Sequence, residues 1–323
     1  MKALYFEKMG DPQSVLLLKQ FDKPTPQANQ VIVKLLGSPI NPSDFFFIGG
    51  SYRIKPELPQ IAGLEGAGII ENTGLGADLP VGTLVSFFSR NAWAEYVVLS
   101  KDDVLVLPND FPVEKAIQFA LNPITAWGLL ERADLKTGDW LLITAGNSVV
   151  SKLIIQIAKI RGIKVIATVR DDKNTATLTS YGAHVVNVNK DNLIEYVQRL
   201  TEGKGAHVAL DAVGGQTGSD VLKCLQSGGR LIIYSRLSPD PIQLYSADVL
   251  YKNISINGFG IRAYLESKTA VQKADIINSL VTIIGDPEFK MEVAASFPLD
   301  NYREAIKTAV EAKKEGKVLF KIH

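Results

Sequence analysis

Short apolar runs, separated by Pro, Gly and Asn clusters, dominate roughly the first hundred residues. The runs fall at residues 31–36, 68–70, 83–88, 94–99 and 104–108. Runs of this length, bounded by turn-forming residues, are typical of short strands. The pattern therefore predicts that the chain opens with a compact β-rich barrel or an irregular sandwich.

From Pro112 onward the pattern changes, because helical periods alternate with apolar strands. Alternation at this spacing predicts a mostly parallel sheet covered by helices on both faces. The last part of the chain contains two helical stretches and then the apolar run 318–322, a strand that we expect to return to the first domain. The predicted helices begin at Val113, Ser148, Asn174 and Gln216, and the predicted strands lie at Trp140, Lys164, His207 and 229–234.

The stretch from Trp140 to Asp172 has the order strand, turn, helix, strand, which is the first half of a dinucleotide-binding unit. Backbone N–H groups and the positive end of the helix converge at such a turn and attract phosphate. Glycines there allow a pyrophosphate to approach the backbone, but this turn reads "GNSVVS" and carries Val149 and Ser151 instead. The turn alone is as compatible with a simple connection as with a nucleotide site.

The end of the next strand favours the nucleotide interpretation. It reads Arg170-Asp171-Asp172-Lys173. An acidic residue in the first position binds the ribose 2′-hydroxyl of NAD, whereas an arginine accommodates the 2′-phosphate of NADP. Arg170 therefore predicts NADPH, and its alternative is a solvated residue at a strand end. A later strand ends in the glycine pair that begins at Gly214, where open α/β sheets place their ligand crevice.

Composition and charge exclude several classes of function. The chain has 323 residues, of which 46% are hydrophobic and 21% charged, as expected of a soluble globular protein with two domains. Its 35 basic and 34 acidic residues give no indication of a nucleic-acid or membrane partner, and no apolar run is long enough to span a bilayer. The single Cys224 and the absence of an apolar signal core at the start indicate a reducing, cytoplasmic location. One cysteine and three histidines do not suffice for a tetrahedral zinc site.

Several blocks of the chain, taken in order, resemble the zinc-free medium-chain dehydrogenases/reductases over essentially the full length. The resemblance is to the quinone oxidoreductases and, more closely, to the 2-enoyl thioester reductases. Zinc-using members carry a "GHE" histidine ligand where this chain reads Gly63-Leu64-Glu65, and leucine cannot bind a metal. The blocks are "SPINPSDFFFIGGSYRIKPELPQIAGLEGAG", "LNPITAWGLL", "GNSVVSKLIIQIA", "TVRDD" and "LDAVGG".

The resemblance implies an α/β protein that combines a GroES-like barrel with a doubly wound Rossmann sheet. The barrel would comprise residues 1–112, the NADPH-binding Rossmann domain residues 113–260, and residues 261–323 would return to complete the catalytic domain. It also implies NADPH in the cleft between the domains and a homodimeric assembly.

Among the site residues, Tyr52 matches the tyrosine that thioester reductases use as catalytic donor. A phenol can protonate or stabilise the enolate that forms when hydride adds to a conjugated double bond. The alternative is a packing or surface tyrosine. Asn41 and Asp44 are further catalytic candidates, although both residue types also form turns by capping their own backbone. The candidate cofactor contacts are Thr125, Gly146, Asn147, Ser148, Val149, Val150, Arg170, Lys173, Gly214, Tyr234, Ser235 and Phe259.

The chain departs from the family at Val149 and Ser151 and again at Tyr234-Ser235-Arg236, where Tyr-Gly-Gly is common. We therefore expect an NADPH-dependent reductase of an activated C=C bond or a quinone, with a 2-enoyl thioester favoured. An NADPH:quinone oxidoreductase and a non-catalytic dinucleotide-binding protein are the alternatives. A thioester of coenzyme A or acyl carrier protein requires basic residues for its phosphates, and the candidates, each also explicable as surface charge, are Arg53, Lys55 and Arg90.

Overall fold

The computed structural model describes residues 1–311 and 315–323 and divides into two compact units. The first unit comprises residues 1–122 and 284–323, and the second comprises residues 123–283. The boundaries predicted from the sequence follow residues 112 and 260, whereas those of the structure follow residues 122 and 283. Helix α3 (Val113–Ile117) packs on strands of the first unit, which places the residues after Pro112 there.

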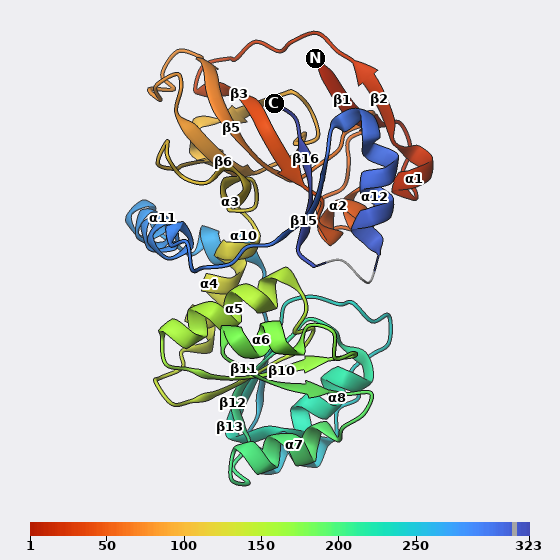
Figure 1. Ribbon diagram of the computed structural model, residues 1–323, viewed down its shortest axis with the longest axis vertical. Coiled ribbons are helices and arrows are strands. Elements are labelled where there is room, and N and C mark those ends of the chain that lie inside the picture. The colour runs from red at the N-terminus through yellow and green to blue at the C-terminus, as the bar shows by residue number, and fades with distance from the viewer. Residues whose placement is uncertain (312–314) are drawn as a thin grey trace. The chain divides into compact units, whose positions relative to one another are not determined.

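Within the described residues, the first unit contains two sheets (Figure 1). The smaller has the order β2-β1-β4, and the larger has the order β15-β16-β3-β5-β6-β8, with β7 also paired to β3. All pairings are antiparallel except that of β15 with β16. The strands are β1 (Lys2–Phe6), β2 (Leu17–Gln20), β3 (Gln30–Pro39), β4 (Gln60–Ile61), β5 (Glu65–Thr73), β6 (Leu84–Phe88), β7 (Tyr96–Ser100), β8 (Val104–Val106), β15 (Val293–Phe297) and β16 (Lys317–Lys321).

The last strand of the chain joins the larger sheet beside β3, the first strand of that sheet along the chain. β16 pairs with β3 in the register Leu319 to Pro39. Its Phe320 is fully buried and meets Trp93 edge-on, with the two ring centroids 5.2 Å apart. The core of the first unit therefore contains side chains from both ends of the sequence.

Helix α2 (Pro42–Ile48) forms where the sequence was interpreted as a turn. Asp44 accepts a hydrogen bond from the backbone N–H of Asn41 at 2.7 Å, and its own N–H donates to the carbonyl oxygen of Asn41 at 3.0 Å. Pro42 occupies a position at which a helix needs no N–H donor. The same residue types favour turns and helix starts, which explains the difference. The other helices of the unit are α1 (Pro12–Val15), α3, α12 (Tyr302–Val310) and the 3₁₀ turns Lys101–Asp103 and Leu299–Asn301.

The second unit contains a six-stranded sheet in the order β11-β10-β9-β12-β13-β14, and all its pairings are parallel. The parallel sheet predicted from the alternation is thus confirmed. Helices α5 and α6 lie on one face, and α7 and α8 lie on the other (Figure 1). The strands are β9 (Trp140–Ile143), β10 (Lys164–Val169), β11 (Ala183–Asn187), β12 (Ala206–Asp211), β13 (Leu225–Ile233) and β14 (Ser255–Gly258).

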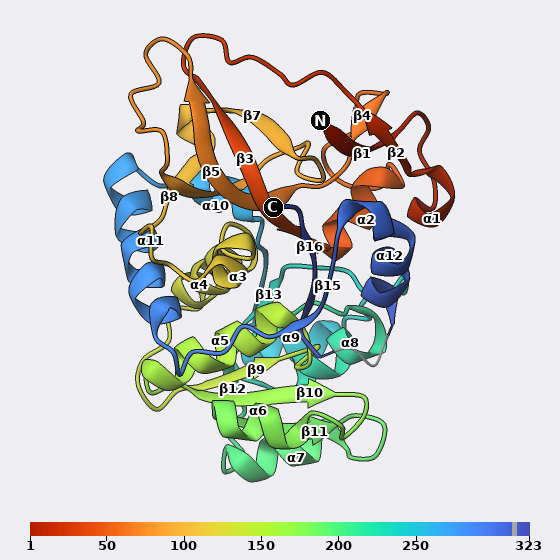
Figure 2. The same cartoon turned by 45° about the horizontal axis from the view of Figure 1, so that its top comes forward.

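The helices of the second unit follow from apolar faces and caps in the sequence. Helix α5 (Val149–Ile160) starts at the N-cap Ser148 and buries Leu153, Ile154 and Ile157 almost completely, so it packs on the sheet as predicted. Figure 2 shows α5 lying against the strands of this sheet. The remaining helices are α4 (Asn122–Ala133), α6 (Thr175–Tyr181), α7 (Leu193–Leu200), α8 (Gly215–Lys223), α9 (Ser246–Lys252), α10 (Ile261–Glu266) and α11 (Ala270–Gly285).

Candidate functional site

Most of the predicted cofactor residues lie at the carboxyl ends of the parallel strands. The strand order reverses between β9 and β12, and open α/β sheets bind ligands outside such a reversal. The turn after β9 is tied to both neighbouring strands, because Thr144 N–H donates to Leu210 O at 3.0 Å and Gly146 N–H donates to Thr168 O at 2.8 Å. The turn is therefore anchored at the point where a dinucleotide is expected.

Ser151, one of the two residues in conflict with the glycine-rich pattern, faces the interior. It is fully buried, and its hydroxyl donates to the carbonyl oxygen of Thr144 at 3.2 Å. Its backbone N–H donates to the hydroxyl of Ser148, also at 3.2 Å, which caps the helix. The side chain of Ser151 thus takes up no space in front of the helix end.

Two backbone donors at the same helix end remain open. Within the described residues, the N–H groups of Val149 and Val150 have no hydrogen-bond acceptor. Asn147, just before the helix, is exposed. The positive end of α5 therefore keeps two donors without an acceptor in the described residues, and phosphate is a group that such donors bind well.

A buried carboxylate holds the neighbouring loop in place. Asp211, at the end of β12, accepts hydrogen bonds from the Thr144 hydroxyl at 2.7 Å, from Val213 N–H at 3.0 Å and from Gly214 N–H at 2.9 Å. Gly214 has φ +77° and ψ −156°, which only glycine adopts readily. The sequence analysis missed Asp211 and Thr144. An acidic residue at the end of a buried strand, three residues before a glycine pair, was the available signal.

Tyr234 and Phe259 follow the next two strands. Tyr234 N–H donates to Asp211 O at 3.0 Å, and its side-chain hydroxyl is buried. Burial raises the pKa of Tyr234 to about 12, against the smaller opposing effect of the nearby Ser151 and Ser148 hydroxyls. Phe259 is half-buried beside Tyr264, with ring centroids 5.6 Å apart. Tyr234 thus packs directly behind the nucleotide turn. The neighbouring Ser235 is half-buried.

Thr125 lies on α4 and is half-buried. Its hydroxyl has no hydrogen-bond partner within residues 1–311 and 315–323, so it is not bonded to its own helical turn. The group is available to a ligand.

The loop after β10 separates its acidic residues from its basic ones. Asp172 accepts a hydrogen bond from Asn187 Nδ2 at 2.7 Å and pairs with the ammonium of Lys190. These contacts, that with Lys190 first, hold the pKa of Asp172 below its usual value. By contrast, the side chains of Arg170 and Lys173 are exposed and have no ion-pair partner in the described part of the chain. The loop therefore offers two open cations at the predicted 2′-phosphate position.

Tyr52, in the first unit, combines a fixed backbone with an open hydroxyl. Its N–H donates to Phe46 O at 2.9 Å, and its half-buried ring packs against the hydrophobic core. Burial raises the pKa of the phenol, an effect that Arg53 opposes and Asp44 supports. Within the described residues the hydroxyl has no hydrogen-bond partner. Tyr52 is thus a neutral acid at ordinary pH with its proton available.

Asn41 and Asp44 are buried close together, with exposed fractions of 1% and 0%. Asn41 Nδ2 donates to Glu65 at 2.8 Å, and Asn41 Oδ1 accepts from the ammonium of Lys317 at 2.7 Å. Burial is the largest cause that raises the pKa values of both Asp44 and Glu65, each to about 7. The polar atoms of Asn41 are therefore engaged inside the first unit.

Glu65 and Lys317 were missed by the sequence analysis. Glu65 was noted only because it follows Leu64 at the position where zinc-using relatives have their "GHE" motif. Lys317 begins the closing apolar strand, and a charged residue at the start of a strand is unremarkable in a sequence. Its burial depends on the pairing of β16 with β3, which no local pattern reveals.

The basic candidates for a phosphate-bearing substrate differ in their contacts. Arg53 is exposed, and its guanidinium has no ion-pair partner in the described ranges. Arg90 pairs with Glu57 at 2.8 Å, and the ammonium of Lys55 donates to the carbonyl oxygen of Gly50. Arg53 is therefore the freest of the three.

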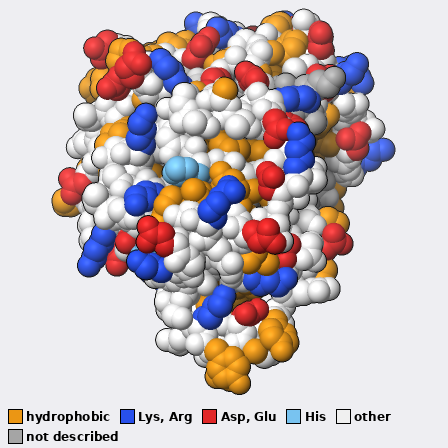
Figure 3. Space-filling view, turned by 60° about the horizontal axis from the view of Figure 1, so that its bottom comes forward, with side chains coloured by type: hydrophobic (Ala, Val, Ile, Leu, Met, Phe, Trp, Pro, Cys, Tyr) orange, Lys and Arg blue, Asp and Glu red, His pale blue; other side chains and the backbone are white. Residues whose placement is uncertain are grey.

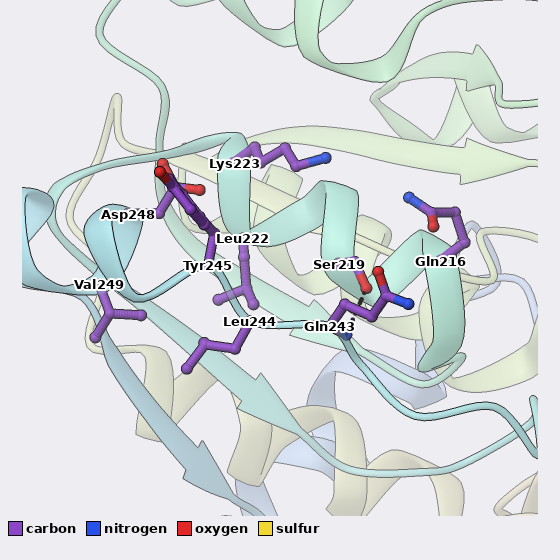
Figure 4. A pocket seen from close by; sticks show the side chains of 9 residues that line it. All are labelled: Gln216, Ser219, Leu222, Lys223, Gln243, Leu244, Tyr245, Asp248 and Val249. Atoms are coloured by element: carbon purple, nitrogen blue, oxygen red, sulfur yellow. Dashed lines mark hydrogen bonds between the residues drawn. The ribbon is translucent and has the colours of Figure 1, made fainter.

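A pocket of about 280 Å³ lies in the second unit between α8 and the segment that leads into α9 (Figure 4). Ser219 on its wall accepts a hydrogen bond from Gln243 N–H at 2.8 Å. None of the predicted cofactor residues lines this pocket, so it is separate from the candidate site. Over the described residues, no group of three or more His, Cys, Asp or Glu side chains is placed to hold a metal ion.

The distribution of surface charge and the length of the helices are relevant to the prediction that the protein has no nucleic-acid or membrane partner. Basic and acidic side chains are interspersed on the face of the molecule seen in Figure 3. In the part of the chain that the structure describes, every helix falls short of the length or the apolar character needed to cross a membrane.

Comparison with known proteins identifies the family. Residues 27–109 match the alcohol dehydrogenase GroES-like domain, and residues 149–277 match the family described as zinc-binding dehydrogenase. The mitochondrial enoyl-[acyl-carrier-protein] reductase of Xenopus tropicalis is 30% identical over 94% of this chain and 91% of its own length.

Two solved structures extend the likeness to the whole fold. A putative NADPH:quinone reductase from Bacillus thuringiensis has a TM-score of 0.93 and 30% identity, and the match covers 100% of this chain and 99% of that one. The Escherichia coli quinone oxidoreductase complexed with NADPH has a TM-score of 0.91 and 25% identity over 99% of both chains. The predicted combination of a GroES-like domain with a Rossmann sheet is confirmed, and the chain belongs to the medium-chain dehydrogenase/reductase family of oxidoreductases.

Proposed function

We propose that this protein is an NADPH-dependent reductase of activated C=C bonds and that its substrate is a 2-enoyl thioester. The observation that carries the choice of substrate is Tyr52, a half-buried phenol with a raised pKa whose hydroxyl has no partner in the described residues. A quinone accepts hydride without a dedicated acid, whereas an enoyl thioester requires a proton at its α-carbon. The enoyl reductases among the relatives support the same choice.

The second unit is proposed as the NADPH-binding domain. The open N–H groups of Val149 and Val150 fit the pyrophosphate, and the open cations of Arg170 and Lys173 fit the 2′-phosphate. The hydroxyl of Thr125 is a further donor or acceptor. Asn147, Ser148, Gly146, Gly214, Tyr234, Ser235 and Phe259 complete the proposed set of cofactor contacts.

The first unit is proposed as the catalytic domain. The nicotinamide, when bound, supplies a hydride to the β-carbon of the double bond. Negative charge then develops on the thioester oxygen and the α-carbon, and Tyr52 donates its phenolic proton to that enolate. Burial keeps Tyr52 protonated until the enolate forms. Asn41 and Asp44 contribute by fixing the segment that carries Tyr52, since both are buried.

The substrate's phosphate groups are proposed to bind Arg53. Its guanidinium is open, and it lies next in sequence to the proposed acid. Phosphate is the group that a guanidinium binds best, in a bidentate geometry.

Steady-state assays test the proposal. With NADPH, turnover of a crotonyl thioester is expected to exceed turnover of a quinone. Tyr52→Phe, which removes only the hydroxyl, is expected to lower kcat for the thioester by about two orders of magnitude. A loss of less than about threefold would show that Tyr52 is not the acid.

Two alternatives are decided by these assays together with a binding titration. Quinone turnover that exceeds thioester turnover and survives Tyr52→Phe identifies an NADPH:quinone oxidoreductase, the activity named for the two solved structures. Failure to bind NADPH at millimolar concentration, measured by nicotinamide fluorescence, identifies a protein that has lost the enzyme function. Tight NADPH binding excludes a decayed nucleotide loop, and tight binding without turnover of either substrate identifies a non-catalytic dinucleotide-binding protein.

A homodimer is proposed from the edge of the parallel sheet. Strand β14 is the outermost strand and its Ile256 is 42% exposed. The preceding segment and α9 expose more large apolar side chains, and an unpaired strand edge beside such a patch favours association. Light scattering of the purified chain tests the dimer, and a monomer at micromolar concentration contradicts it. The exposed apolar residues are Leu237, Leu244, Tyr245, Leu250 and Tyr251.

A cytoplasmic location is proposed from the single Cys224 and stays a prediction.

A further inference from the structure

A buried lysine from the last strand reaches the segment that carries the proposed acid. Lys317, the first residue of β16, is only 7% exposed. Its ammonium donates to Asn41 Oδ1 at 2.7 Å. Asn122 Nδ2 also approaches that oxygen, at 3.3 Å. Asn41 Oδ1 therefore accepts from two side chains that come from the middle and the end of the chain.

The other end of the Asn41 amide is held equally firmly. Its Nδ2 donates to Glu65 Oε2 at 2.8 Å, and Glu65 Oε1 accepts from Leu121 N–H at 2.7 Å. The lysine ammonium identifies which end of the amide is the oxygen, because an ammonium can only donate. The orientation of Asn41 is thus specified by a cation on one side and a carboxylate on the other.

Asn41 transmits this orientation to Tyr52 through one short helix. It is the N-cap of α2, and its N–H donates to Asp44 at 2.7 Å. At the other end of the helix, Phe46 O accepts from Tyr52 N–H at 2.9 Å. Both ends of α2 are therefore fixed by hydrogen bonds, and Tyr52 is attached to the second end.

We propose that Lys317 is a positioning residue for the reductase reaction, which fixes Asn41 and, through helix α2, the phenol of Tyr52. The inference rests on the proposed function in that Tyr52 is the acid. A buried cation is costly unless it is paired and hydrogen-bonded, so an apolar residue at this place in the strand would stabilise the fold at least as well. A lysine is justified by the geometry that it imposes on Asn41.

Kinetics of the full-length chain give the first test. Lys317→Met is expected to lower kcat for the thioester about tenfold, because the proton donor is displaced from its productive geometry. NADPH affinity is expected to change less than about twofold, since the proposed cofactor contacts lie in residues 123–283. Lys317→Arg retains the charge and several donors and is expected to recover at least about a third of wild-type kcat.

Lys321→Met is the matched control. Lys321 lies on the same strand, and its ammonium forms an exposed pair with Glu114 at 2.7 Å. This variant is expected to retain wild-type kcat. A kcat for Lys317→Met within about twofold of wild type would overturn the inference.

Hydrogen exchange tests the same inference without relying on activity. In Lys317→Met, amides of residues 42–52 are expected to exchange about tenfold faster, while those of β1 and β2 in the same unit keep their wild-type rates. Equal acceleration throughout the first unit would mean that Lys317 acts only on stability, and unchanged rates at 42–52 would also overturn the inference. Should Lys317→Met fail to fold, Lys317→Gln, which keeps a donor without the charge, replaces it. The same comparison of exchange rates, residues 42–52 against β1 and β2, then decides. If the wild-type protein does not reduce the thioester, the proposed function is refuted. The exchange result then still decides whether Lys317 positions helix α2.

Discussion

The polar groups of the two units are used in opposite ways. In the first unit, Asn41, Glu65 and Lys317 are buried and joined by hydrogen bonds to one another. In the second unit, the N–H groups of Val149 and Val150 at the positive end of α5 have no acceptor in the described residues. The first set of groups is closed on itself, and the second has no partner among the described residues.

This difference separates positioning from binding. A buried polar group without a partner destabilises the fold, so a closed network fixes geometry and has little capacity left for a ligand. Open donors beside open cations cost little in water, and they gain most when an anion arrives. We therefore expect changes in the first unit to act on stability and turnover, and changes in the second to act on cofactor affinity.

The largest effect is expected from Glu65→Ala. Removal of the carboxylate leaves the Asn41 amide and Leu121 N–H without their acceptor and leaves Lys317 with less compensating charge. The free energy of unfolding is expected to fall by about 3–5 kcal/mol, which urea denaturation measures.

The surface pair of Lys321 and Glu114 provides the control for that variant. Both side chains are about half exposed, at 52% and 50%. Glu114→Ala is expected to lower the stability by less than about 1 kcal/mol. Equal losses of stability in Glu65→Ala and Glu114→Ala would contradict the view that the buried network stabilises the fold more than an exposed ion pair does.

The next effect is expected at the phosphate-selecting loop. Arg170→Ser removes a guanidinium that no acidic side chain of the described residues engages. NADPH is expected to bind about 10- to 100-fold more weakly, and NADH affinity is expected to stay within about twofold. Fluorescence titration with both cofactors makes the comparison, and a parallel loss for NADH would refute the assignment of Arg170 to the 2′-phosphate.

Val149→Pro tests the open helix end itself. Proline is well tolerated at the first position of a helix, and the preceding Ser148 has the extended conformation (φ −70°, ψ 152°) that proline requires of its neighbour. The substitution therefore deletes one N–H with little effect on the fold. We expect NADPH and NADH affinities to fall together by about tenfold, because both cofactors share the pyrophosphate. Unchanged affinity for both would show that the Val149 N–H does not contact the pyrophosphate.

The fold and the unpartnered polar groups of the second unit could be predicted from the sequence. Alternating periods predicted the parallel sheet, and Arg170 predicted the cation at the end of β10, because both features depend on residues near one another in the chain. The sequence left open whether Ser151, in place of a glycine, leaves room for a pyrophosphate at the nucleotide turn. The structure turns its side chain inward to Thr144, and no pattern of residue types specifies that direction.

The buried hydrogen-bonded network of the first unit could not be predicted from the sequence. Asn41, Glu65, Asn122 and Lys317 come from four distant segments, and their contacts depend on the pairing of β16 with β3. Each residue has an ordinary local explanation as a turn, a strand end or a surface charge. Only tertiary packing shows that the four are buried together.

The closed network also predicts a pH dependence of stability. Burial raises the pKa values of Asp44 and Glu65 to about 7, well above those of the unfolded chain. Between the unfolded and folded pKa values the folded protein binds more protons, so these groups lower the stability as the pH rises through that window. Asp44→Asn keeps an acceptor for Asn41 N–H and removes one titrating group. The loss of stability between about pH 5 and about pH 8 is expected to be smaller in this variant than in the wild type, and equal losses would contradict the assignment.

The smallest effect is expected from Lys190→Met, which changes an exposed contact beside the open cations. Lys190 and Asn187 engage Asp172, so its carboxylate is compensated in the loop that contains Arg170. Without the lysine, the uncompensated charge repels the 2′-phosphate, and screening by solvent keeps the effect small. We expect about a two- to fourfold loss in NADPH affinity at low salt, little change for NADH, and disappearance of the difference at high salt. Lys223→Met, which breaks the exposed pair with Asp220 on α8, is the control and is expected to alter neither affinity. A salt-independent loss for both cofactors would mean that Lys190 supports the shape of the loop and has no part in its choice of phosphate.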